Sequence, residues 1–262
     1  MIPLADDNPT RTKPYVVYIL ILLNVLVYLY DRMGALGSIG RLWDWSMIPS
    51  FVINGHPITK TIPVLVNGAQ RAAEITYTGL HPRWLTIFSS MFMHGSLLHI
   101  GGNMLYLWIF GNNIEDSLGH AKFVAFYLLC GVIAALAHMA VNIHSQVPTV
   151  GASGAIAGVL GAYLMLYPKQ DIRTLVFLGF FWTFIEVPAL IVLGVWFVTQ
   201  LLGLAGSGGM MGGGVAYGAH VGGFVAGIAL ILLFGGRKLV SGTRYYRRSP
   251  RYDDAPDKWR SL

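Results

Sequence analysis

The chain has 262 residues, of which 55% are hydrophobic and only 11% are charged. A soluble globular protein carries about 25% charged residues, so this composition excludes an ordinary soluble domain. The apolar residues come in long blocks rather than in short alternating runs, which is typical of membrane helices and not of a membrane barrel. The net charge of +6 would suit nucleic-acid binding. The basic residues flank the apolar blocks, however, where they orient membrane spans, and we therefore predict no nucleic-acid partner.

Six apolar segments are predicted to cross the membrane, since a span requires about 20 apolar residues and fewer where aromatic residues mark its ends. The predicted spans cover residues 15–30, 88–110, 121–143, 151–167, 172–202 and 215–235. The fold class is thus predicted as all-α and polytopic, with a six-span membrane domain over residues 15–236. Glu186 and Pro188 fall inside the fifth predicted span, and the role of this acid is left open.

The regions outside the spans differ in character. Residues 1–14 form a polar segment, and no cleavage motif follows the first span, so we expect this span to remain as an anchor. A long first loop covers residues 31–86 and contains Asn67-Gly68, a turn-forming pair that predicts a β-hairpin over residues 58–78. A glycine-rich loop, residues 203–214, is predicted to be a flexible cap.

The basic residues predict the orientation of the spans. An even number of spans leaves both termini on one side of the membrane. Most Lys and Arg residues lie in the N-terminal segment, in the short connections on that side and in a basic tail over residues 237–262. Because such residues accumulate in the cytoplasm, both termini are predicted to be cytoplasmic. Cys130 is the only cysteine, which excludes an internal disulfide.

Four polar residues fall at comparable positions in the even-numbered spans. His99 and Asn103 lie in the second, Ser153 opens the fourth, and His220 lies early in the sixth. These spans all run in the same direction, so the four side chains are expected at a similar depth, in the outer half of the membrane. A lone serine in a membrane helix usually bonds back to its own backbone, and Asn103 alone would suit helix–helix contact. Four such groups at one depth indicate a functional site instead.

Small residues accompany these polar groups at a four-residue spacing. Gly154 and Gly158 follow Ser153, while Gly223 and Gly227 follow His220. Glycines at this spacing let two helix backbones approach closely. A close approach is what a serine nucleophile needs to reach a histidine base, at about 2.6–3.2 Å.

The polar residues and glycines form three motifs in chain order: His94-x4-His99-x3-Asn103, Gly151-x-Ser153-Gly154 and Ala219-His220-x2-Gly223-x3-Gly227. Over nearly all of its six-span core, the chain therefore resembles the rhomboid family of intramembrane serine proteases.

The resemblance implies a role for each residue that matches the family pattern. Ser153 is implied as nucleophile and His220 as general base, forming a dyad without an Asp. His99 and Asn103 are implied as oxyanion donors, together with the Ser153 backbone N–H. The implied reaction is hydrolysis of peptide bonds in or near transmembrane segments of client proteins, through an acyl-enzyme, with no cofactor or metal.

Two departures from the family pattern stand out. Ala157 occupies the position where some members carry a Tyr that stacks on the base, so Tyr217 or packing is expected to hold His220 instead. The pair Arg83-Trp84 is reversed and displaced relative to the Trp-Arg pair of many members.

Other functions fit the sequence less well. A zinc metalloprotease would need His-Glu-x-x-His, which is absent, and a soluble-type hydrolase elbow would need Gly where Ala155 stands. A transporter predicts internally repeated broken helices, and we find no repeat. A catalytically inactive relative that only binds clients is expected to lose Ser153 or His220, and both are present.

The expected setting follows from these features. The partners are transmembrane substrates and membrane lipid, and the membrane is predicted to be a bacterial cytoplasmic one because the core carries no additional span. We expect access of a client to require movement of the fifth span or of residues 203–214.

Overall fold

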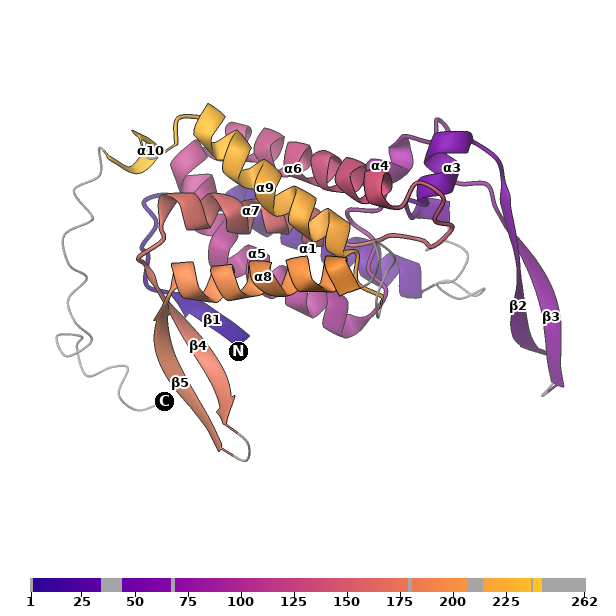
Figure 1. The fold of residues 1–262 in the computed structure, drawn as a ribbon, viewed down its shortest axis with the longest axis horizontal. Coiled ribbons are helices and arrows are strands. Elements are labelled where there is room, and N and C mark those ends of the chain that lie inside the picture. The colour runs from indigo at the N-terminus through magenta and orange to yellow at the C-terminus, as the bar shows by residue number, and fades with distance from the viewer. Residues whose placement is uncertain are drawn as a thin grey trace.

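The computed structural model describes residues 2–33, 44–66, 69–178, 181–206, 214–236 and 238–241. Long helices run side by side and form the body of the molecule, and a β-hairpin projects from each end (Figure 1). Most of the predicted cap over residues 203–214, the Asn67-Gly68 turn and nearly all of the basic tail lie outside the described residues. Of the tail, the structure describes the short helix α10 (Lys238–Ser241).

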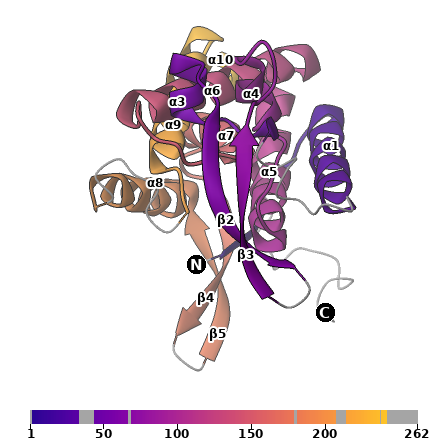
Figure 2. The same cartoon turned by 90° about the vertical axis from the view of Figure 1, so that its right-hand side faces the viewer.

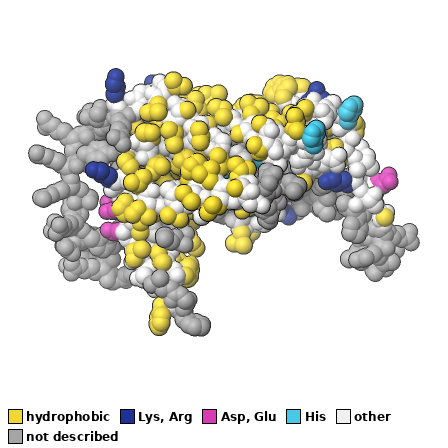
Figure 3. Space-filling view, viewed as in Figure 1, with side chains coloured by type: hydrophobic (Ala, Val, Ile, Leu, Met, Phe, Trp, Pro, Cys, Tyr) yellow, Lys and Arg dark blue, Asp and Glu magenta, His cyan; other side chains and the backbone are white. Residues whose placement is uncertain are grey.

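Each predicted span overlaps one long helix of the body, although several of these helices begin or end outside the predicted bounds. These helices are α1 (Tyr15–Arg32), α5 (Leu97–Leu118), α6 (His120–Val141), α7 (Ser153–Leu166), α8 (Ala189–Gly206) and α9 (Tyr217–Leu233). Within the described residues, three helices, α1, α6 and α8, are long and apolar enough to cross a membrane, and α7 and α9 are apolar but shorter. Hydrophobic side chains cover the middle of the visible face, whereas charged side chains stand toward its ends (Figure 3). This distribution suits a protein embedded in lipid.

The prediction of a continuous fifth span over residues 172–202 is wrong in its first half. Asp171–Leu178 and Phe181–Pro188 form the antiparallel strands β4 and β5, and the helix α8 begins only at Ala189. Residues with β-branched and aromatic side chains dominate this stretch and favour strands. Glu186 consequently lies exposed on β5, opposite Arg173 in the strand register, and not inside a helix.

The N-terminal segment is also more ordered than its polar composition predicts. Ile2–Asp6 forms strand β1, which pairs with β4 and gives a three-stranded sheet in the order β1-β4-β5. The pairing joins residues more than 160 positions apart, from Ile2↔Leu175 to Asp6↔Ile172. The all-α prediction therefore holds for the body of the molecule but omits this sheet.

The long first loop contains the hairpin that its turn residues predict. Strands β2 (Ile58–Val66) and β3 (Ala69–Tyr77) pair in antiparallel register. A short helix, α3 (Pro49–Asn54), precedes the hairpin, and Phe51 on it meets the buried ring of Tyr77 edge-on, with ring centroids 4.7 Å apart. The Tyr77 hydroxyl donates to the Ser46 carbonyl at 2.7 Å. These contacts attach the base of the hairpin to the helical body.

The second span begins later than predicted. Leu85–Ser89 forms a separate short helix, α4, and α5 starts at Leu97 and extends to Leu118. The Ser96 side chain accepts a hydrogen bond from the His99 backbone N–H at 3.1 Å, a standard N-cap. This cap fixes where the helix starts and therefore where His99 points.

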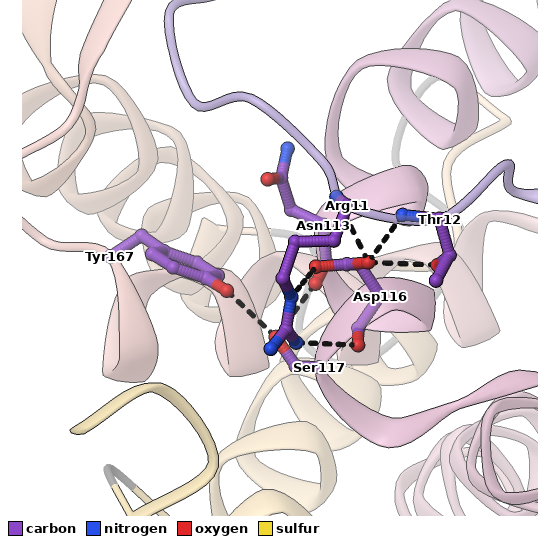
Figure 4. A network of polar contacts seen from close by, with 6 residues as sticks. All are labelled: Arg11, Thr12, Asn113, Asp116, Ser117 and Tyr167. Carbon is purple, nitrogen blue, oxygen red and sulfur yellow. Dashed lines mark hydrogen bonds and ion pairs between the residues drawn. The ribbon is translucent and has the colours of Figure 1, made fainter. Parts of the chain in front are cut away.

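Polar contacts tie the N-terminal segment to the last turn of α5. The Asp116 carboxylate accepts hydrogen bonds from the backbone and side chains of Arg11 and Thr12, at 2.8–3.1 Å (Figure 4). Nearby, the Ser117 and Tyr167 hydroxyls share a 2.7 Å hydrogen bond that joins α5 to the end of α7. The buried Glu115 carboxylate accepts from the first free N–H groups of α1, where the helix dipole favours a negative charge. One end of the helical body is thus joined by polar contacts.

Candidate active site

The site is built around the start of α7. Gly151, which precedes this helix, has a φ of +125°, a conformation that side chains disfavour. A Cβ at this position would lie 2.7 Å from Nε2 of His99, so glycine also leaves room between that ring and Ser153. Because α7 begins at Ser153, the N–H groups of its first turn have no partner within the helix. The backbone N–H of Ser153 is therefore oriented like the donors of an anion site.

Glycines bring α9 into backbone contact with α7. A methyl group on Gly223 would overlap the carbonyl oxygen of Gly154, and one on Gly227 would overlap the carbonyl oxygen of Gly158. Gly161 makes a third such contact, with the carbonyl of Phe224. The glycine spacing noted in the sequence thus corresponds to a helix crossing at which the two backbones touch.

This crossing sets the distance between the serine and the histidine. The Oγ atom of Ser153 and the Nε2 atom of His220 lie 2.8 Å apart, within hydrogen-bond range. Both side chains are half-buried. The two residues come from helices that start 64 positions apart in the chain, and the glycine contacts hold them in register.

His99 and Asn103 line the same cavity as this pair. The cavity has a volume of about 530 Å³, and α5, α7, α8 and α9 all contribute to its wall. The Nδ2 atom of Asn103 is buried and has no hydrogen-bond partner among the described residues, so it is a free donor beside the cavity. The four polar residues singled out in the sequence therefore surround one space.

The other histidines occupy different surroundings. His94, which shares a motif with His99, is buried and packs edge-on against that ring at 5.0 Å. His138 is buried, and its Nε2 lies 3.2 Å from the Thr149 hydroxyl. His144 is exposed.

A residue that the sequence analysis missed contacts His220 from α8. The Oε1 atom of Gln200 lies 2.8 Å from His220 Nδ1, and the Trp196 ring lies 5.8 Å from the imidazole at a tilt of 33°. Tyr217, expected to hold the base, lies instead with its ring against Gly203. The sequence signal that could have identified Gln200 is its amide, because every other residue of α8 except Thr199 is apolar.

An apolar helical body with a serine in hydrogen-bond contact with a histidine points to a class of protein: a membrane protein in which these two side chains are arranged as hydrolases arrange a nucleophile and its base. Comparison with known sequences identifies the family. Residues 81–237, more than half of the chain, match the Rhomboid domain, and the chain belongs to the rhomboid family.

Its curated relatives include bacterial and mitochondrial proteins. The chain is 32% identical over 162 residues to rhomboid protease GluP of Bacillus subtilis, covering 62% of this chain and 30% of the relative. It is 31% identical over 150 residues to rhomboid protein 1, mitochondrial, of Saccharomyces cerevisiae, covering 55% and 40%. The human presenilin-associated rhomboid-like protein, mitochondrial, is 37% identical over 94 residues, covering 35% and 24%. The aligned part thus spans less than half the length of each of these relatives.

Proposed function

We propose that this protein is an intramembrane serine endopeptidase that hydrolyses peptide bonds in or near transmembrane segments of membrane-protein clients. The observation that carries the proposal is the 2.8 Å contact between Ser153 Oγ and His220 Nε2 beside a cavity enclosed by apolar helices. Family membership and a relative named as a rhomboid protease support it.

In the proposed mechanism, Ser153 attacks the carbonyl carbon of the scissile bond while His220 Nε2 takes the hydroxyl proton. Collapse of the tetrahedral intermediate breaks the C–N bond, and His220 returns the proton to the leaving amine. Water then attacks the acyl-enzyme, again with His220 as base, and releases the new carboxyl group and the free serine. No acid among the described residues contacts His220, so the proposed mechanism uses a Ser–His dyad.

The oxyanion that forms during this attack requires hydrogen-bond donors. The buried Nδ2 of Asn103, which has no partner among the described residues, supplies one, and the first-turn N–H of Ser153 supplies another. His99, on the same helix face as Asn103, is proposed as the third. Removal of one such donor typically lowers kcat by about 100- to 1000-fold.

The setting of the reaction follows from the helix lengths. The 14 residues of α7 extend about 21 Å, less than the ~30 Å of a bilayer core, so Ser153 lies below the membrane surface if α7 reaches the opposite face.

The domain division proposed is a six-span core over residues 15–236, between cytoplasmic segments 1–14 and 237–262. We propose that the protein lies in the bacterial cytoplasmic membrane, where its apolar helices contact lipid.

The test compares the parent with Ser153→Ala and His220→Ala, in lipid, on a single-span substrate. Ser50→Ala and His144→Ala are matched controls, since neither side chain lines the cavity. We expect the parent and controls to cleave, the two site variants to be inactive, and a fluorophosphonate to label Ser153 by mass spectrometry. Cleavage by Ser153→Ala at the parent rate would contradict the proposal. Absence of both cleavage and labelling in the parent would instead favour a client-binding relative.

A further inference from the structure

The base of the proposed dyad has a second hydrogen-bond partner, supplied by α8, a helix that carries none of the four polar residues singled out in the sequence. His220 Nε2 faces Ser153, and its Nδ1 faces Oε1 of Gln200 at 2.8 Å. Gln200 lies on α8 and is only 9% exposed, although half of the residues of that helix are exposed. A buried amide in an apolar helix requires partners, and the imidazole is one of them.

The contacts of the Gln200 amide determine which of its two ends faces His220. Its Nε2 atom donates to the Trp196 carbonyl at 3.3 Å and contacts the Thr199 hydroxyl at 3.1 Å. The Thr199 hydroxyl itself donates to the Trp196 carbonyl at 2.6 Å, so its oxygen is free to accept. With the NH₂ group held by these acceptors, the carbonyl end of the amide is directed at the imidazole.

A carbonyl oxygen only accepts hydrogen bonds, so it requires a proton on His220 Nδ1. In neutral imidazole this leaves Nε2 as the unprotonated nitrogen. That nitrogen is the one in contact with Ser153 Oγ, where a general base has to accept the proton. The opposite tautomer would place an N–H against the serine and a lone pair against the glutamine oxygen.

We propose that Gln200 is a positioning residue that fixes the tautomer and orientation of His220. His220 can then act as a general base only while α8 is packed against α9. This inference rests on the proposed function of Ser153 and His220 and adds to it a role for α8. The Trp196 ring, which packs against the rings of both His220 and Phe224, limits rotation of the imidazole from the same helix. If a client displaces α8 on its way to the cavity, Gln200 leaves with the helix and returns only when the helix closes.

Two substitutions separate a positioning role from a structural one. Gln200→Leu keeps the size of the side chain in an apolar helix but removes the acceptor, and Gln200→Glu restores an acceptor at the same reach. Leu201→Ala, at an exposed neighbouring position, is the matched control. We expect Gln200→Leu to lower kcat roughly 10- to 100-fold with little change in KM, because an unpaired Nδ1–H costs about that factor. Gln200→Glu should recover most of the loss.

The second measurement reads the tautomer directly, by ¹⁵N NMR of labelled histidine, with the His220 signals assigned by their loss in His220→Ala. His99 and His138, the titratable neighbours that act on His220, are present in every variant and serve as internal references. We expect an Nδ1-protonated imidazole in the parent and a mixture of tautomers in Gln200→Leu.

An unchanged kcat in Gln200→Leu overturns the inference, as does a fall in kcat with an unchanged tautomer and no recovery in Gln200→Glu. The NMR measurement needs no turnover. It therefore decides the role of Gln200 even if the parent neither cleaves nor labels, the result that would contradict the proposed function itself.

Discussion

The helix α9 contacts α7 and α8 in different ways. Against α7 it packs backbone to backbone, because Gly223 and Gly227 leave no side chain between the helices. Every residue of α7 from Gly154 to Tyr163 is buried. Against α8 it packs through large side chains, with the rings of Phe197 and Phe224 stacked at 4.3 Å.

The two neighbours also differ in how much of them is enclosed. Figure 2 shows α8 at one edge of the helical body and α7 near its centre. Within α8, Ala189, Val192, Leu193 and Gln200 are buried, whereas most of the remaining side chains are exposed. Backbone contacts of the α7–α9 kind cannot shift without overlap, while stacked side chains can separate and re-form. The comparison indicates that the proposed nucleophile and base sit on the fixed pair of helices, and the partner of the base on the helix able to move.

The largest expected effect comes from one methyl group placed in the contact between α7 and α9. In Gly227→Ala the new Cβ would overlap backbone atoms of Gly158. Forcing the helices apart costs about 1–3 kcal/mol of stability and separates Ser153 from His220. We expect a lower unfolding temperature in detergent and at least a tenfold slower fluorophosphonate labelling of Ser153, since the rate falls tenfold for each 1.4 kcal/mol.

The matched control places the same methyl group on the other helix. A Cβ at Gly194, on α8, would meet no atom within 4 Å. Gly194→Ala should therefore keep the labelling rate and gain up to about 1 kcal/mol of stability from helix propensity. Similar behaviour of Gly227→Ala and Gly194→Ala would remove the distinction between the two contacts.

A smaller effect is expected from loosening α8. Phe197→Ala removes the stack on Phe224, worth about 1 kcal/mol. If α8 moves aside to admit a client, cleavage of a membrane-embedded substrate should rise up to about fivefold relative to cleavage of a short soluble peptide. The ratio of the two rates is the measured quantity, because loss of the Gln200 contact would slow both substrates equally. An unchanged ratio would count against movement of α8 as the route of access.

The smallest effect on the candidate site is expected at the polar end of α7, where a change acts on stability. Asp6 on β1 accepts hydrogen bonds from the Tyr163 hydroxyl of α7 at 2.8 Å and from Asn113 of α5 at 2.6 Å. Burial raises the pKa of the Asp6 carboxyl to about 7. In the unfolded chain this pKa is about 3.9, so the folded state binds the proton more tightly and its stability falls as the pH rises from about 4 to about 7.

We expect Asp6→Asn, which keeps an acceptor oxygen but cannot ionise, to lose this part of the pH dependence. Thermal unfolding at several pH values between about 5 and 8 measures it, as a difference of a few degrees. Asp6→Ala also lacks the ionisation but leaves Tyr163 and Asn113 without their acceptor, and should be less stable than Asp6→Asn at every pH. The full parent slope in Asp6→Asn would show that another group titrates in this range.

Local signals explain what the sequence predicts well. Asn67-Gly68 between alternating residues predicts the hairpin that β2 and β3 form, and apolar blocks predict the helices α6 and α7 to within a few residues. The glycine spacing predicts close helix contact, and the motif order suggests which polar residues share a cavity. Apart from the motif order, each of these signals lies within a single segment of the chain.

What the sequence alone missed depends on distant partners. β4 becomes a strand with β1 and β5 on either side, and β1 lies at the other end of the chain. The start of α5 depends on the Ser96 cap, which a hydropathy pattern does not register. In the sequence, Gln200 is only an isolated amide in an apolar helix. Its partner, His220, is apparent only once α8 packs beside α9.

The sequence by itself therefore determined the family, the apolar helices and the identity of the candidate nucleophile and base, because those features are carried by composition, spacing and motif order. The tertiary structure alone decided that Ser153 and His220 stand 2.8 Å apart and that Gln200 occupies the other side of the imidazole. Hydrogen bonds depend on distances of a few tenths of an ångström between side chains from different helices. Those distances are set by how the helices pack, which no single segment of the chain encodes.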